Sequence, residues 1–166
     1  MPIEVATLDD LDRIVELWVA LAEEQREHGT HLTVEPNREL IRESLAQRIV
    51  DQTCLVARRS EAGHGSAPIV GFLSFDHERN GLDRDVERGV IENLYVVPEL
   101  RGEGLGTDLL EVAEAALTGA GADRLVLEAM AENEAARRFY EAQGYHPHRV
   151  TYERPAPDGK DTKEEG

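Results

Sequence analysis

Apolar side chains recur every three or four residues in two segments near the N-terminus, at 11–28 and 37–49. This spacing collects the apolar positions on one face of a helix, so it predicts two amphipathic helices. A short apolar segment at 3–6 precedes them and predicts a strand. Thr7 lies three residues before Asp10, which is the spacing of a capping box at the start of the first helix.

The rest of the chain alternates between short apolar runs and helical patterns. The short runs predict further strands, at 53–58, 69–75, 90–97, 124–130 and 145–153. Two segments with helical spacing predict helices at 107–120 and 133–143. The resulting order, β-α-α-β-β-β-α-β-α-β, predicts an α/β (α+β) fold with a mixed central sheet of six to seven strands flanked by about four helices.

The length of 166 residues fits one domain, which we expect to span 1–153. Beyond it, 154–166 has no apolar residue other than alanine and is predicted to be a disordered tail. The single cysteine, Cys54, excludes a disulfide framework and a cysteine-based zinc cluster. The first ten residues include acidic residues and no basic one, unlike a signal peptide. No apolar run approaches the roughly 20 residues of a membrane span. We therefore expect a cytoplasmic protein without a signal peptide or membrane contact.

The chain carries 34 acidic and 18 basic residues, for a net charge of −16. Its only lysines, Lys160 and Lys163, lie in the predicted tail. This balance argues against a nucleic-acid partner, which requires a basic surface. Two explanations fit the acidity: a cationic substrate, or a carboxylate-covered surface that keeps the protein soluble in a salt-rich, halophilic cytoplasm.

A glycine-rich segment at 101–106 connects a predicted strand directly to a predicted helix. Glycines allow tight turns that expose consecutive amides, and a helix N-terminus adds its own free amides and the positive end of its dipole. The segment therefore suits a phosphate or pyrophosphate, with a plain turn as the alternative. It matches neither common nucleotide motif, because no lysine follows Gly106 as in a P-loop and Leu109 replaces the last glycine of the dinucleotide fingerprint.

Two stretches together resemble one family. The first is Arg101-x-x-Gly104-x-Gly106 after a strand, which resembles motif A of the GCN5-related N-acetyltransferase (GNAT) superfamily. The second, NEAARRFYEAQGY at 133–145, resembles motif B of the same family, and the predicted order of elements resembles the family's fold. The resemblance covers about 1–153 and implies acetyl-CoA as cosubstrate, with no metal.

The resemblance implies where acetyl-CoA would bind. Its pantetheine would pair with the backbone of Leu94, Tyr95 and Val96. Its pyrophosphate would lie on the backbone amides of Arg101, Gly102, Glu103, Gly104, Leu105, Gly106 and Thr107. Asn133 would cap the motif B helix and contact the pantetheine. Arg137 would meet the 3′-phosphate, or would be an ordinary solvated arginine.

Two residues are candidates for acid–base chemistry. Glu92 lies in an otherwise apolar strand and is a candidate general base acting through water, or a structural partner of an arginine. Tyr140 is a candidate acid for the departing thiolate, or a core residue. The resemblance implies that the loop between the first two predicted helices contributes to the specificity for the acceptor. Three glutamates beside this loop would suit a cationic group, namely Glu23, Glu24 and Glu27.

The function expected from these residues is transfer of an acetyl group to a primary amine by direct attack in a ternary complex. The acceptor would be a small amine, a polyamine, or a lysine or N-terminal amine of a protein. The alternative is a non-catalytic acyl-CoA-binding sensor or interaction module. Edge strands in such a sheet would allow a homodimer.

Overall fold

The computed structural model describes residues 2–59, 67–78 and 82–157. The chain forms two compact units, Met1–Glu134 and Ala135–Gly166, and each is described by itself. Residues 158–166 of the predicted tail lie outside the described residues, whereas 154–157 are described and form neither helix nor strand. No helix in the described part of the chain is long and apolar enough to cross a bilayer.

A mixed five-stranded sheet forms the centre of the first unit. Its strands are β1 (Ile3–Val5), β2 (Cys54–Arg58), β3 (Ile69–His77), β4 (Arg88–Val96) and β5 (Arg124–Val126), arranged in chain order. The first three junctions are antiparallel, and β4 pairs with β5 in parallel. The predicted mixed sheet is therefore confirmed, with its parallel pair at the crossover through a helix.

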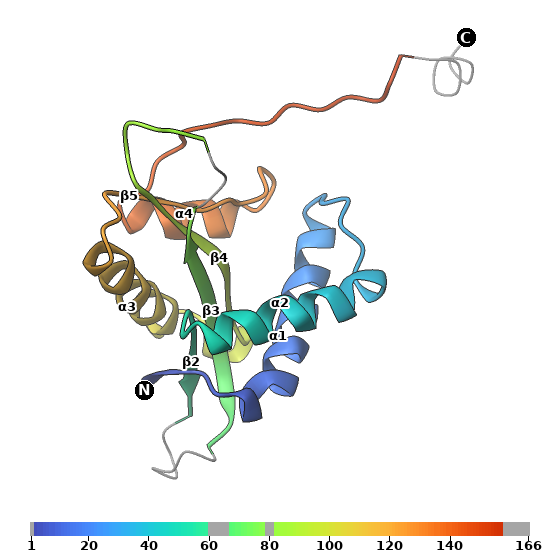
Figure 1. The fold of residues 1–166 in the computed structure, drawn as a ribbon. Coiled ribbons are helices and arrows are strands. Elements are labelled where there is room, and N and C mark those ends of the chain that lie inside the picture. Colours follow the sequence, from blue (N-terminus) through green and yellow to red (C-terminus); the bar gives the residue numbers. More distant parts are fainter. Residues whose placement is uncertain (1, 60–66, 79–81, 158–166) are drawn as a thin grey trace. The chain divides into compact units, whose positions relative to one another are not determined.

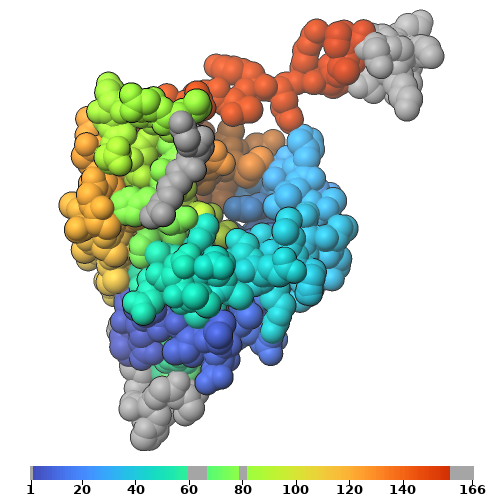
Figure 2. Space-filling view, viewed as in Figure 1, coloured from blue at the N-terminus to red at the C-terminus, as the bar shows by residue number. Residues whose placement is uncertain are grey.

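Three helices pack on this sheet. The first two, α1 (Leu11–Glu27) and α2 (Arg38–Val50), lie on one face, and α3 (Leu105–Gly119) lies on the other (Figure 1). Only Leu45 and Ile49 of α2 are buried, because α2 lies at the molecular surface (Figure 2). With α4 (Glu134–Ala142), which follows β5, the described residues contain the four α-helices that the periodicity predicts.

The approach of α3 to the sheet depends on a strand position without a side chain. A Cβ atom on Gly89 of β4 would lie 2.9 Å from both methyl groups of Leu117. Leu117 is 1% exposed, so its side chain has little room to move. The glycine therefore allows the helix to pack directly against β4.

Two predicted strands differ from the structure. β5 ends at Val126 rather than at residue 130, and no strand forms among the described residues 145–153, so the sheet has five strands rather than six to seven. Val150 and Tyr152, which lie in the strand predicted at 145–153, are 64% and 90% exposed. Pro147 also lacks the amide that a strand ladder uses.

Candidate active site

Strand β4 is longer than its pairing with β5, so part of its backbone on that side has no partner strand. The parallel pairing joins only 88–90 of β4 to 124–126 of β5. Along 91–96, no strand in the described ranges pairs with this side of β4, while the other side stays paired with β3. The sheet therefore presents an unpaired strand edge in its interior, where an extended ligand can form backbone hydrogen bonds.

Alternation of the backbone decides which groups face this opening. The Val97 amide donates to the Val70 carbonyl at 2.9 Å, on the β3 side. Since successive backbone groups point to alternate sides of a strand, those of Val96 and Leu94 face the opening and those of Tyr95 face β3. Of the three residues expected to pair with pantetheine, two therefore present backbone groups to the opening.

The glycine-rich loop that follows β4 leads directly into α3. Gly102 and Gly104 have φ angles of 85° and 90°, which favour glycine, and nothing lies within 4 Å of a Cβ atom built on either. The amides of 102–106 have no hydrogen-bond acceptor within the described parts of the chain. The first helical bond of α3 runs from the Asp108 amide to the Gly104 carbonyl at 2.9 Å. These free amides and the positive end of the helix dipole make the loop an anion site.

The Arg101 side chain is tied to neighbouring elements by hydrogen bonds rather than left free for a phosphate. Its Nε donates to the Val96 carbonyl at 2.8 Å, and its Nη2 donates to Glu24 of α1 at 2.8 Å. Its guanidinium lies over the Tyr95 ring, 5.2 Å from the centroid. Burial and then the nearby Glu24 charge raise the pKa of the Tyr95 hydroxyl. Arg101 therefore ties the loop to β4 and to α1, and Glu24 is already paired with a cation.

Glu92 occupies a β-bulge of β4. The pairing with β3 passes from Asn93 opposite Ser74 to Ile91 opposite Phe75, so Glu92 is the additional residue of the bulge. A bulge redirects a side chain, and bulges are common beside active sites. Here the bulge aims the Glu92 carboxylate at α2, where Arg48 binds it with Nε and Oε1 3.0 Å apart. The sequence leaves open whether Glu92 is a base or the partner of an arginine, and the structure identifies that arginine.

Two further kinds of chemistry can be assessed, namely attack by a cysteine and metal binding. Cys54 is fully buried in β2, and burial raises the pKa of its thiol to about 12, so it is not a nucleophile at neutral pH. No group of three or more His, Cys, Asp or Glu side chains suited to a metal ion occurs in the described ranges.

The motif B residues lie at and beyond the junction of the two units. Asn133 directly precedes α4, at the expected cap position, and Arg137 and Tyr140 lie on α4. Tyr140 packs edge-on against Phe139 and Tyr145, with ring centroids 5.3 and 6.2 Å apart. Burial raises the pKa of the Tyr140 hydroxyl, which keeps it protonated at neutral pH. The two units are described separately, so the structure does not test whether Tyr140 and Glu92 share one site.

Sequence reasoning missed Arg48 and the internal pairing of Glu24. Arg48 pairs with a residue 44 positions away, and Glu24 pairs with a residue 77 positions away. The spacing of apolar residues does not report such contacts. The only local signal is that Arg48 lies three residues before Asp51, with which it forms an ion pair at 3.6 Å.

The sequence profile of the Acetyltransferase (GNAT) family matches residues 11–145. The chain is similar to N-alpha-acetyltransferase 30 of Schizosaccharomyces pombe, with 38% identity over 87 residues covering 47% of this chain and 58% of that protein. It is also similar to the aminoalkylphosphonate N-acetyltransferase of Salmonella typhimurium, with 35% identity over 77 residues covering 46% and 49%. The chain thus spans about half the length of these curated relatives.

Solved structures agree with this result at the level of the fold. A tetramutant of the BH1408 protein of Bacillus halodurans has a TM-score of 0.79 to this chain at 21% identity. The match covers 93% of this chain and 99% of the other. The family profile, which covers most of the chain including the open strand and the glycine-rich loop, shows that the chain belongs to the GNAT acetyltransferase family.

Proposed function

We propose that the protein transfers the acetyl group of acetyl-CoA to a primary amine by direct attack within a ternary complex. The observation that carries this proposal is the continuity of three features along one strand. The bulge with Glu92, the open backbone at Leu94 and Val96, and the loop of free amides at 102–106 follow one another along β4 and its end.

Each of these features suits one part of the donor. Backbone groups of Leu94 and Val96 suit the pantetheine amides, although the Val96 carbonyl already accepts a bond from Arg101. The free amides of 102–106, including those of Glu103, Leu105 and Gly106, suit the pyrophosphate, and Thr107 is proposed as a further contact. The Arg101 amide is not available, because it already donates to the Pro98 carbonyl at 3.2 Å. On the motif resemblance we also propose Tyr95, Asn133 and Arg137 as contacts, with Arg137 at the 3′-phosphate.

The chemistry requires that the ammonium loses a proton, that the oxyanion is stabilised and that the departing thiolate gains a proton. An acceptor amine near pKa 10.4 reaches the site as an ammonium, and Glu92 takes its proton through water. The amine nitrogen then attacks the thioester carbon, and a backbone amide of the open strand stabilises the oxyanion. When the carbon–sulfur bond breaks, the Tyr140 hydroxyl donates a proton to the sulfur. As the intermediate collapses, the nitrogen loses its second proton to solvent, which leaves a neutral N-acetylated amine and free CoA. Glu92 then releases its proton to solvent and solvent reprotonates Tyr140, so one proton is released per turnover.

The acceptor is proposed only as a class of amines. By name, one relative acetylates N-terminal α-amines and the other acetylates aminoalkylphosphonates, which are chemically different amines. We therefore propose an acceptor among small amines, polyamines and protein amines.

The test is release of free thiol by the purified protein with acetyl-CoA and a panel covering these amines, at low salt and in molar KCl. Thiol release that depends on one class of amine supports the proposal. Tight CoA binding without thiol release from any amine would instead support a non-catalytic acyl-CoA-binding module. A bulky residue at Gly104, for example Gly104→Val, serves as the control, because its φ of 90° is strained for valine and the loop should lose CoA binding.

Replacing Glu92 tests the proposed base. We expect Glu92→Gln to lower kcat by about 10²- to 10⁴-fold and to weaken the dependence of the rate on pH, because glutamine accepts no proton. Glu111→Gln on α3 removes the same charge elsewhere and should leave the rate unchanged. A near-normal kcat with an unchanged pH profile in Glu92→Gln would remove Glu92 as the base.

A further inference from the structure

Arg48 holds the Glu92 carboxylate by both of its oxygens. The Arg48 Nε lies 3.0 Å from Oε1 and its Nη2 lies 3.4 Å from Oε2. The guanidinium comes from α2 and the carboxylate from the bulge of β4, which joins two elements far apart in sequence. Such a forked pair fixes the plane of a carboxylate as well as its position.

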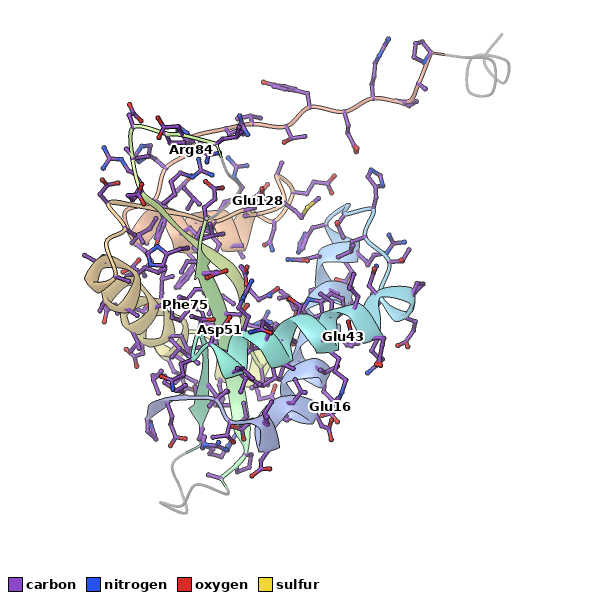
Figure 3. The ribbon with its side chains drawn as sticks, in the orientation of Figure 1. Glu16, Glu43, Asp51, Phe75, Arg84 and Glu128 are labelled. Atoms are coloured by element: carbon purple, nitrogen blue, oxygen red, sulfur yellow. The ribbon has the colours of Figure 1, made fainter. Side chains whose placement is uncertain are left out.

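Arg48 is itself fixed by two further carboxylates. Its Nη2 lies 3.2 Å from Asp76 of β3, and its Nη1 lies 3.6 Å from Asp51, which follows α2 (Figure 3). The Arg48 side chain is only 19% exposed, so these pairs are partly shielded from solvent. The hydrogen bond that Arg48 donates to Glu92 raises the pKa of Arg48, burial acts in the opposite direction, and the charges of Glu92, Asp76 and Asp51 raise it further. Arg48 is thus a permanent cation with little freedom to move.

The charges around Glu92 make it dependent on this cation. Arg48 of α2 contacts Glu92 directly, and Arg48 also pairs with Asp51, which follows α2, and with Asp76 of β3. From α1, Glu24 reaches the same strand at Tyr95, where Arg101 neutralises it. Cys54 of β2 is uncharged, since its pKa is raised to about 12. Without Arg48, three carboxylates would remain together with no cation among them, and like charges disfavour the ionised form of each.

Building on the proposed function, we propose that Arg48 is a positioning residue for proton transfer, which keeps the Glu92 carboxylate ionised and oriented toward the acceptor amine. Each Glu92 oxygen has lone pairs that Arg48 does not occupy, and these accept the proton of the ammonium through water. The arginine transfers no proton itself. Its role is to hold the carboxylate in a fixed position and orientation.

The first test is the pH dependence of kcat/KM in Arg48→Gln, Arg48→Lys and a control. The acid limb of this profile is the pH range over which kcat/KM falls as the pH is lowered. We expect Arg48→Gln to move this limb to higher pH by about one unit or more, because a neighbouring cation lowers a carboxyl pKa by about one to three units. Arg48→Lys keeps the charge but not the fork, so the limb should stay near its original pH while kcat falls. The control is Arg42→Gln, which removes another arginine of α2, one that pairs with Asp12 of α1 at 2.6 Å. It should leave the limb in place.

A purely structural role for Arg48 gives different results. It would lower the Tm of Arg48→Gln without moving the acid limb of its pH profile. If Arg48→Gln fails to fold, Asp76→Asn provides a test of opposite sign. Removing this carboxylate takes a like charge away from Glu92, so its acid limb should move to lower pH. A limb that stays in place in folded Arg48→Gln or in folded Asp76→Asn would overturn the proposal.

A second readout separates this inference from the proposed function. The Glu92 carboxyl carbon is followed by NMR in protein labelled with ¹³C-glutamate and assigned with Glu92→Gln. We expect it to titrate at higher pH in Arg48→Gln and at lower pH in Asp76→Asn, with or without turnover. Thiol release from no amine would overturn the proposed function, whereas an unchanged titration would overturn the role of Arg48.

Discussion

At the residue scale, arginine carries the positive charge of nearly the whole chain, since lysine occurs only at 160 and 163. The contacts show what arginine provides here. Arg48 bridges three carboxylates from two strands and the end of a helix, and Arg58 bridges two carboxylates and a carbonyl. A planar guanidinium has five donors in a rigid fork, whereas an ammonium is a compact point charge. In a chain with many more acids than bases, a single arginine can therefore hydrogen-bond to several acids at once, although it balances the charge of only one.

Tyr140 allows a prediction at the same scale. Because burial raises its pKa, the hydroxyl stays protonated at neutral pH and is available as a donor to the departing thiolate. We expect Tyr140→Phe to lower kcat by about 10²- to 10⁴-fold while KM for acetyl-CoA changes little. Steady-state thiol release measures both constants.

The matched control for Tyr140 is Tyr145→Phe, which removes the hydroxyl from the ring that packs edge-on against it. Its kcat should stay near that of the unmodified protein. A Tyr140→Phe variant that retains kcat would show that Tyr140 contributes packing only.

At the element scale, the ion pair between Glu24 and Arg101 links helix α1 to the glycine-rich loop. The two side chains are 33% and 45% exposed, so the pair contributes at most about 1 kcal/mol. We expect Glu24→Gln to loosen the loop and to raise KM for acetyl-CoA by up to about fivefold, with little change in kcat. Steady-state kinetics measures both, and Glu23→Gln on the same helix should have no effect. A loss confined to kcat would contradict this role.

A buried ion pair joins three other elements. Arg58 of β2 binds Asp10 at 2.9 Å, at the end of the short helix η1 (Leu8–Asp10), and Glu4 of β1 at 2.9 Å. The Arg58 and Asp10 side chains are only 10% and 9% exposed. We expect Asp10→Asn to lower the free energy of unfolding by about 3 kcal/mol, because it leaves a buried guanidinium without its buried partner. Urea unfolding measures this. Glu4→Gln removes the more exposed partner and should cost about 1 kcal/mol or less.

The same pair predicts a dependence on pH. Burial alone raises the pKa of Asp10, but the Thr7 amide and the Arg58 guanidinium outweigh it, so the folded-state pKa is lower than the usual value. A carboxyl with a lowered pKa adds stability above its unfolded-state pKa, and this stability is lost as the pH falls through the folded-state pKa. The stability of the unmodified protein should therefore fall below about pH 4, and that of Asp10→Asn should fall less steeply. Parallel curves would contradict the assignment.

Sequence predicts elements well where local interactions decide them. The capping box at Thr7 forms, with its amide donating to Asp10 at 2.9 Å. Gly29 and Gly144, which suit the left-handed turn that ends a helix, lie two residues past the ends of α1 and α4 with φ angles of 101° and 98°. The end of β5 depends instead on where neighbouring strands separate, and the Glu92–Arg48 pair depends on packing between distant elements. Local sequence does not encode such tertiary geometry, so the glycine loop could be predicted and the partner of Glu92 could not.

At the scale of the whole molecule, the acidic surface opposes both folding and the proposed ligand. The carboxylates are spread along the chain, and helices α1 and α2 carry Glu16 and Glu43 at their surfaces (Figure 3). Acetyl-CoA is itself a polyanion, so it approaches this protein against a repulsive field. The free amides of the loop act over short distances and do not remove that repulsion. Salt should therefore lower KM for acetyl-CoA at first, opposite to the behaviour of a site built from exposed lysines and arginines.

Stability should respond to salt in the same direction. At 1 M KCl the screening length is about 3 Å, so repulsion between surface carboxylates is largely removed. The exposed ion pairs are weakened too, but each contributes little, and the buried pair of Arg58 and Asp10 is screened much less. With 34 acids and 18 bases, the removed repulsion outweighs the lost attraction. We expect Tm to rise between dilute buffer and molar KCl, measured by thermal unfolding with NaCl as a control for the cation. A Tm that falls steadily as KCl is added would mean that attractive pairs, and not the excess of carboxylates, dominate the electrostatics of the fold.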